Sequence, residues 1–154
     1  MVNNSNGTIL LVDDSANDIE ITLHALRLNR INNHVDVIRD GEDALNYFFC
    51  ETSSNGAIAH NLLFVLLDIK LPKVNGIEVL AKLKSHRTTR HIPVIMLTAS
   101  NQEKDINECY ELGANSYIVK PVNFDDFRET IRILGSYWIE HNRQVFTQFG
   151  GSRE

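Results

Sequence analysis

Polar side chains stand at the ends of four apolar runs in this sequence, and together they match a phosphoryl-transfer site. The runs end in Asp13-Asp14, Asp68, Thr98 and Lys120. Runs that are apolar almost throughout are typical of parallel strands buried on both faces. In an open parallel sheet, functional groups gather beyond the carboxyl ends of the strands. We therefore expect these carboxylates, the hydroxyl and the ammonium to meet at one edge.

The three carboxylates are predicted to bind a divalent cation. Carboxylates held within a few ångströms repel one another, and a cation relieves that repulsion. Hard oxygen ligands suit Mg²⁺, which keeps several waters and also takes phosphate oxygens. The alternative is that Asp13 and Asp14 cap the following helix, a role for which Asp is favoured and for which Ser15 also stands nearby. Because Asp68 stands at the end of another strand, the three carboxylates together favour the metal site over helix capping.

Asp68 is the candidate nucleophile, because a carboxylate can take a phosphoryl group as a mixed anhydride. Lys120 would pair its ammonium with a carboxylate or a phosphoryl oxygen, and a cis bond to Pro121 would fix the direction in which Lys120 points. The Thr98 hydroxyl could bind a phosphoryl oxygen, with room left by the small Ala99. Taken singly, Asp68 would be a residue that organises a turn, Lys120 a surface lysine and Thr98 an ordinary strand residue. Their convergence favours phosphoryl transfer.

The elements that must position these groups alternate between strands and helices. This alternation predicts one α/β domain with helices on both faces of a parallel sheet. We predict strands at about 8–13, 34–38, 62–67, 93–98 and 115–119. We predict helices at about 16–29, 41–49, 76–86, 102–112 and 123–145. The domain is expected over 8–141, with a partly disordered C-terminal extension over 142–154.

The composition argues against several classes of function. The 154 residues are 43% hydrophobic and 23% charged, with a net charge of −5. This acidic balance disfavours a nucleic-acid or anionic-membrane surface. No apolar run approaches the roughly 20 residues of a membrane span, and the polar N-terminus is unlike a signal peptide, so we expect a cytoplasmic protein. Cys50 and Cys109 lack metal-like spacing and are predicted to be reduced and in or near the core.

The motifs together resemble the receiver domains of response regulators in two-component signalling. The resemblance covers about 8 to 138 and is carried by Asp13-Asp14, Asp68 with Pro72 and Gly76, Thr98-Ala99, Tyr117 and Lys120-Pro121. It implies a flavodoxin-like fold: a doubly wound, five-stranded parallel sheet in the order 2-1-3-4-5 with five helices. It also implies that a sensor histidine kinase phosphorylates Asp68. The protein would not be an enzyme, apart from catalysing its own phosphorylation and dephosphorylation.

The resemblance further implies a ligand set for the metal. Mg²⁺, or Mn²⁺ or Ca²⁺ in its place, would be held by Asp14, Asp68, the backbone carbonyl of Lys70 and, through water, Asp13. Lys70 also places a second cation beside Asp68.

The resemblance implies that Thr98 and Tyr117 form a switch pair. On phosphorylation the hydroxyl would move toward the phosphoryl group and the ring would turn inward. These movements would change the face formed by helix 102–112, strand 115–119 and helix 123–145, which we call the output face. We expect a homodimer through this face, aided by Tyr137, Trp138 and the aromatic tail, because the last helix carries more apolar residues than one core needs.

A narrower resemblance links the chain to stand-alone receivers that partner cyanobacterial and other bacterial phytochrome kinases. It is carried by the long segment 51–61, the run Leu71-Pro72-Lys73 and the aromatic C-terminal helix. Such a protein would signal without an attached effector, and no helix-turn-helix pattern follows the receiver.

Other readings of the same residues remain open. The chain could be a receiver-like interaction module that is never phosphorylated, although every chemical residue is present. A dehalogenase-type phosphohydrolase would carry Asp-x-Asp after its first strand, whereas Asp13 and Asp14 are adjacent. A flavin carrier would need a phosphate loop rich in Ser, Thr and Gly after that strand.

Overall fold

Five strands form the predicted parallel sheet, in the order β2-β1-β3-β4-β5. The strands are β1 (Thr8–Val12), β2 (Val35–Ile38), β3 (Leu62–Leu67), β4 (Val94–Thr98) and β5 (Ser116–Val119). Every pairing between neighbours is parallel. The computed structural model describes residues 7–50 and 61–143, and the structural statements below concern these residues.

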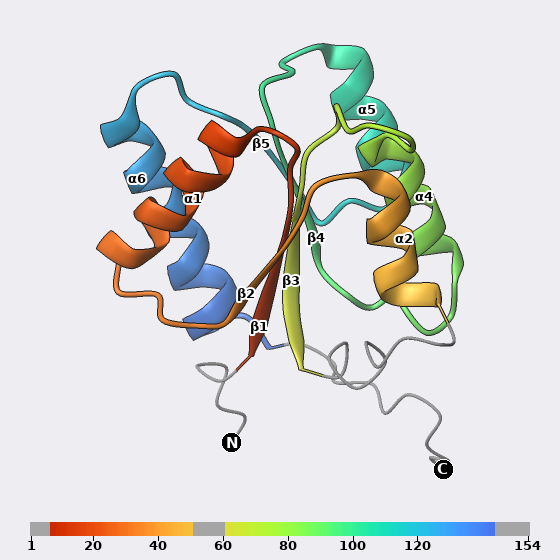
Figure 1. The fold of residues 1–154 in the computed structure, drawn as a ribbon, viewed down its shortest axis with the longest axis horizontal. Coiled ribbons are helices and arrows are strands. Elements are labelled where there is room, and N and C mark those ends of the chain that lie inside the picture. The colour runs from red at the N-terminus through yellow and green to blue at the C-terminus, as the bar shows by residue number, and fades with distance from the viewer. Residues whose placement is uncertain (1–6, 51–60, 144–154) are drawn as a thin grey trace.

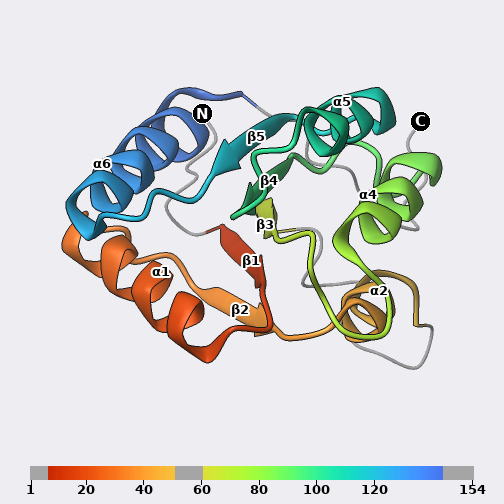
Figure 2. The same cartoon turned by 90° about the horizontal axis from the view of Figure 1, so that it is seen from above.

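Helices cover both faces of the sheet, as Figures 1 and 2 show. One layer is formed by α1 (Ala16–Leu28) and α6 (Phe124–Gly135), and the other by α2 (Gly41–Phe49), α4 (Gly76–Ser85) and α5 (Glu103–Leu112). Alternate strand residues serve the two layers: Ile9 and Leu11 pack toward α1 and α6, while Leu10 and Val12 pack toward the other three helices. Both faces of β1 are therefore buried, which explains its continuous apolar run.

Short polar residues fix where the helices begin. The side chains that cap α1, α2, α4 and α6 belong to Ser15, Asp40, Asn75 and Asn123. Each such cap stabilises its helix by about 1 kcal/mol. The alternative that Asp13 and Asp14 cap α1 is therefore wrong, because Ser15 is the cap and both carboxylates stay at the edge of the sheet.

The last helix differs from its prediction, because α-helical winding ends at Gly135 and a π-helix, η2 (Ser136–His141), follows. Gly135 lies so close to the segment after α1 that a Cβ atom there would come within 2.5 Å of Ile31 Cδ1. The wider turns of η2 set both Trp138 and Ile139 against the core. The expected aromatic tail, with Phe146 and Phe149, lies outside the described residues, as does all of the predicted extension over 142–154 except its first two residues.

Two further expectations from the sequence concern the burial of the cysteines and the absence of a membrane-spanning helix. Cys109 is buried as predicted, but Cys50 is exposed, because it stands at the C-terminal end of α2, outside the face that packs on the sheet. Within residues 7–50 and 61–143, none of the helices is long and apolar enough to cross a membrane.

Candidate functional site

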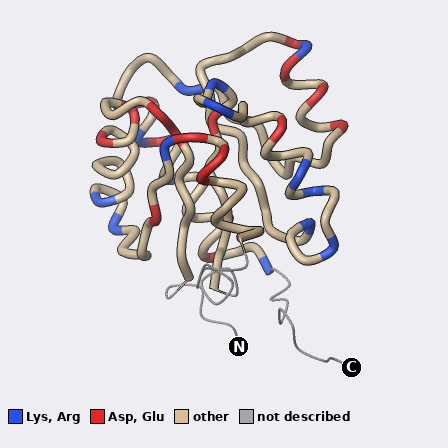
Figure 3. The backbone as a smooth tube through the Cα atoms, turned by 45° about the vertical axis from the view of Figure 1, so that its right-hand side comes forward, with Lys and Arg blue, Asp and Glu red and all other residues tan. Residues whose placement is uncertain are grey.

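Lys120 lies at the centre of the candidate site. Its ammonium nitrogen is 2.8 Å from Asp13 Oδ2, 2.9 Å from Asp18 Oδ2 and 3.0 Å from Asp68 Oδ2. Asp13, Asp68 and Lys120 each follow the last residue of a strand, namely β1, β3 and β5. The parallel order of the sheet therefore brings them to one edge, as the sequence predicted. Figure 3 shows acidic residues concentrated at the end of the molecule where the strands end.

Asp68 is held firmly by its own loop. The backbone N–H of Ile69 donates to Asp68 Oδ1 over 2.7 Å, while Oδ2 receives the Lys120 ammonium. The turn back into α4 passes directly behind it, because the N–H of Gly76 donates to the Ile69 carbonyl at 2.7 Å. A Cβ atom on residue 76 would lie 1.9 Å from the Asp68 carbonyl oxygen, so only glycine permits this turn. Asp68 is thus buried yet fixed in direction.

The electrostatics of the site show an excess of negative charge. Burial raises the pKa of Asp13 above its ordinary value, although the Lys120 ammonium and the Ser15 N–H donate hydrogen bonds to it. Burial alone would lower the pKa of Lys120, but its hydrogen bonds to Asp13 and Asp18 and the charge of Asp68 raise that pKa. Lys120 therefore stays charged at neutral pH and offsets part of the repulsion among the carboxylates.

The residues at this edge suit a divalent cation by charge and donor type. Asp14 is exposed beside the buried carboxylates and lines an open hollow with Ile69, Lys70 and Asn75. Hard oxygen donors with surplus negative charge are what Mg²⁺ prefers. Within the part of the chain that the structure describes, no group of three or more His, Cys, Asp or Glu side chains is placed so that it could hold a metal ion. The Lys120 ammonium instead occupies the point where Asp13, Asp18 and Asp68 converge.

Asp18 is a residue of the site that the sequence analysis missed. It lies in the first turn of α1, where an acidic residue is also expected for its effect on the helix dipole. Its side chain is 39% exposed, and it reaches Lys120 because α1 packs along the same edge. The suggested cis bond before Pro121 is also not found, since residues 7–50 and 61–143 contain only trans peptide bonds. Three carboxylates, rather than a cis bond, orient Lys120.

Thr98 and Tyr117, the predicted switch pair, both form hydrogen bonds with a third residue, Ser100. Thr98 is buried at the end of β4, and its Oγ1 accepts from the N–H of Ser100 at 3.4 Å. The Tyr117 hydroxyl donates to the Ser100 carbonyl at 2.9 Å. Both predicted residues are therefore bonded to the loop between β4 and α5.

The site is open to solvent on one side. A hollow beside Lys120 is lined by Asp18, Ala99, Pro121 and Val122, among others. Ala99 is exposed there, which leaves the predicted room for an incoming group.

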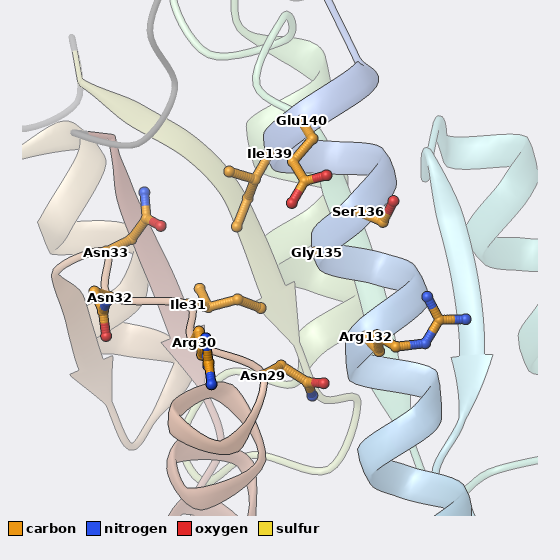
Figure 4. A pocket seen from close by; sticks show the side chains of 10 residues that line it. All are labelled: Asn29, Arg30, Ile31, Asn32, Asn33, Arg132, Gly135, Ser136, Ile139 and Glu140. Atoms are coloured by element: carbon orange, nitrogen blue, oxygen red, sulfur yellow. The ribbon is translucent and has the colours of Figure 1, made fainter.

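A separate hollow lies between the segment after α1 and the last helix, as Figure 4 shows. Ile31 and Ile139 lie within it, and its rim carries Arg30, Arg132 and Glu140. It is found where α1 ends and β2 has yet to begin, at the amino ends of the strands. No residue of the carboxylate site lines it, so we assign it no part in the chemistry above.

Comparison with known proteins identifies the family. The model of the response regulator receiver domain matches residues 9–132, which span all the residues placed at the site. The chain belongs to this family. The flavodoxin-like fold with sheet order 2-1-3-4-5 is thereby confirmed.

Similar proteins include two regulators of comparable length. Response regulator Rcp1 of Synechocystis sp. is 35% identical over 132 residues, which cover 86% of this chain and 88% of Rcp1. The probable methanogenesis regulatory protein FilR2 of Methanothrix harundinacea is 34% identical over 135 residues, covering 88% of this chain and 85% of FilR2.

Solved structures extend the resemblance to the fold. Phosphorylated RcpA, a cyanobacterial phytochrome response regulator, superposes with a TM-score of 0.81 at 33% identity, covering 90% of this chain and 98% of RcpA. The Mn²⁺-bound form of Rcp1 gives 0.80 at 32% identity, covering 90% and 99%. The resemblance to receivers of phytochrome systems is thus confirmed.

Proposed function

We propose that this protein is a response regulator that accepts a phosphoryl group on Asp68 from a sensor histidine kinase. One observation carries the proposal: the buried Asp68 carboxylate lies 3.0 Å from the Lys120 ammonium, beside the strand end that bears the Thr98 hydroxyl. A carboxylate is a competent nucleophile toward phosphorus. The neighbouring cation and hydroxyl supply the positioning and charge neutralisation on which phosphoryl transfer depends.

The transfer moves one phosphoryl group from nitrogen to oxygen. An oxygen of Asp68 attacks the phosphorus of a phosphohistidine, and the phosphorus–nitrogen bond breaks. The imidazole nitrogen keeps the bonding electron pair and takes up a proton, which leaves an acyl phosphate on Asp68. Lys120 pairs with a phosphoryl oxygen, and Thr98 donates a hydrogen bond to another. A Mg²⁺ ion held by Asp13, Asp14, Asp68 and the Lys70 carbonyl would neutralise charge on the phosphoryl oxygens when bound.

Acetyl phosphate tests this function without the kinase. Protein treated with acetyl phosphate and Mg²⁺ should gain the mass of one phosphoryl group. Borohydride reduction and peptide mapping should then place the group on Asp68 alone. The alternative, a receiver-like interaction module, predicts no gain in mass, and label on another residue would reject Asp68 as the acceptor.

The similarity to RcpA, a phytochrome response regulator, supports a phytochrome-like kinase as the phosphoryl donor. FilR2, a probable methanogenesis regulatory protein, is similar to nearly the same degree, and a comparison of two kinases distinguishes the possible donors. Phosphotransfer from a purified phytochrome kinase should outpace transfer from an unrelated histidine kinase. Equal rates would remove the phytochrome assignment and leave the phosphoryl acceptor intact.

Mg²⁺ should stabilise the protein, and Asp14→Asn should remove most of that effect. The surplus negative charge at the site favours a cation, and Asp14 is its exposed carboxylate. At a Mg²⁺ concentration ten times its dissociation constant, the gain in unfolding free energy should be about 1.4 kcal/mol. Thermal unfolding at rising Mg²⁺ measures this gain. Asp125→Asn, at an exposed position in the first turn of α6, is the control and should keep the full response. An unchanged response in Asp14→Asn would remove Asp14 from the ligand set.

A homodimer through the output face, here α5, β5 and α6, is part of the proposal. Ile133 and Tyr137 are 56% and 51% exposed, and both line a groove along β5, the last strand of the sheet. Exposed apolar residues beside an open strand edge suit a second copy of the same face. Trp138 was expected to help, but it packs against Phe64 with ring centroids 6.5 Å apart. Trp138 also lines the groove beside Tyr137, so it packs on the core and borders the proposed interface.

Tyr137→Glu should shift the protein from dimer to monomer. The added charge would be buried at the proposed interface without a partner, which is costly. Sedimentation equilibrium measures the mass, with and without a phosphoryl mimic. Val37→Glu is the matched control, since Val37 is 38% exposed on β2 at the opposite edge of the sheet. A monomeric wild-type protein in every state would remove the dimer from the proposal.

A further inference from the structure

Arg39 places a cation beside the carboxylates of the site. It directly follows β2, and the pairing of Val12 with Ile38 continues past the strand ends, where the N–H of Asp13 donates to the Ile38 carbonyl at 3.0 Å. Arg39 is therefore the residue beside Asp13 in the order of the sheet. Its guanidinium Nη2 donates to the backbone carbonyl of Asp14 at 3.5 Å. The end of β2, which carries none of the residues assigned so far, thus also contributes a side chain to this edge.

The charge of Arg39 is not neutralised by a neighbouring carboxylate. Within residues 7–50 and 61–143, the ion pairs join other basic side chains to Asp and Glu, and Arg39 takes part in none of them. Its 3.5 Å bond to a neutral carbonyl is at the long end of the range. The residue is exposed, and a guanidinium presents a flat fork of donors that suits phosphate oxygens. Arg39 is therefore available to an anion that arrives from solvent.

The charge balance of the site gives such a cation a role. Three carboxylates share the Lys120 ammonium, and Asp14 adds a further, exposed carboxylate. A phosphoryl donor is itself negatively charged, so this surplus repels it as it approaches. The Lys120 side chain is only 11% exposed and is already bonded to three carboxylates, which leaves little of its charge to act outside the site. A cation at the rim reduces the repulsion before the donor arrives.

We propose that Arg39 attracts the anionic phosphoryl donor to the site and, by the same charge, weakens the binding of Mg²⁺. This inference rests on the proposed function, to which it adds a residue that controls the approach of the donor. Both effects are electrostatic, because the guanidinium attracts a donor of opposite charge and repels a metal ion of like charge. Arg39 is thus neither the nucleophile nor a metal ligand. It changes the affinity of the site for its two reactants in opposite directions.

Arg39→Gln should slow labelling by acetyl phosphate about twofold and tighten Mg²⁺ binding about twofold, at an ionic strength of about 0.1 M. This is the effect of one charge on a doubly charged ion about 10 Å away in water. Labelling rates are compared at saturating Mg²⁺, so that tighter metal binding does not enter them, and amide shifts during a titration give the Mg²⁺ dissociation constant. Both differences should vanish at about 1 M salt, where the Debye length is about 3 Å. Arg39→Lys keeps the charge and should behave as wild type.

Arg27→Gln is the matched control. Arg27 is an exposed arginine in the last turn of α1, whereas the site lies at the first turn of that helix. The control removes the same charge and should change neither the labelling rate nor the Mg²⁺ dissociation constant. If Arg39 only fixed the loop after β1 through the Asp14 carbonyl, Arg39→Gln would instead weaken Mg²⁺ binding, and that result would overturn the proposal.

A failure of the proposed function gives a different result from a failure of this inference. Wild-type protein that takes up no phosphoryl group would reject the function. The Mg²⁺ titrations need no phosphoryl transfer, so they would then decide whether Arg39 acts on the site through its charge. Wild-type protein and Arg39→Gln that are labelled at equal rates would leave the function intact and remove Arg39 from it.

Discussion

Asp68→Asn should give a folded protein whose labelling by acetyl phosphate falls to background. The amide oxygen of Asn can still accept the Ile69 N–H that now bonds to Asp68 Oδ1, so the loop retains its anchor. An amide, however, does not attack phosphorus as a carboxylate does. The loss therefore reflects chemistry, and circular dichroism and thermal unfolding should show an intact fold.

Asp18→Asn is the matched control for this variant. It also removes one carboxylate that contacts the Lys120 ammonium, since Asp18 Oδ2 lies 2.9 Å from that nitrogen and Asp68 Oδ2 lies 3.0 Å from it. Asp18, however, stands at the solvent side of the cluster. Its labelling should persist. Equal loss in both variants would mean that the charge balance at Lys120, and not a nucleophile at Asp68, controls the reaction. Full labelling of Asp68→Asn would show that another residue is the acceptor.

Lys120→Met should cost about 3 kcal/mol of unfolding free energy at pH 7 without divalent cations, because removal of one partner leaves buried carboxylates uncompensated. The Lys120 side chain is 11% exposed and those of Asp13 and Asp68 are 2% and 12% exposed, so solvent screens the cluster only weakly. Met keeps much of the packing of the lysine stem. The fold should survive, whereas the response of the Tyr117 amide to a phosphoryl mimic should disappear.

The loss of unfolding free energy in Lys120→Met should become smaller as the pH falls from 7 toward 5. The raised pKa of Lys120 means that wild-type protein has this stabilisation in full throughout that range. The pKa of Asp13 is already above its ordinary value and should rise further without the ammonium. The native variant then binds protons more readily than its unfolded chain, so acid stabilises it relative to wild type.

Urea denaturation at the two pH values measures the effect. Lys104→Met, at an exposed lysine of α5, is the control and should change stability by less than about 0.5 kcal/mol. A Lys120→Met protein as stable as wild type at pH 7 would contradict the role given to Lys120. So would a loss of stability that is the same at both pH values. A normal Tyr117 response in this variant would show that Lys120 does not couple the site to the output face.

The sequence by itself determined the sheet and three of the four groups that now touch in the site. Apolar runs marked the strands, and polar residues after β1, β3 and β5 had to share an edge, because parallel strands end on the same side. Asp13, Asp68 and Lys120 could therefore be brought together without any knowledge of packing. The family resemblance added the strand order, which the structure confirms.

Only the tertiary structure decided which helix and loop groups join them. Asp18 and Ser100 have ordinary local roles near a helix start, and the sequence does not show where their side chains point. Asp18 reaches Lys120 because α1 packs beside α6 along the sheet, and Ser100 meets Tyr117 because β5 lies beside β4. Gly135, where the chain changes to η2, likewise lies against Ile31, a residue far away in the chain. Local sequence determines whether a segment forms a strand, a helix or a loop. The directions of the Asp18 and Ser100 side chains depend instead on contacts between segments far apart in the chain, which no short stretch of sequence contains.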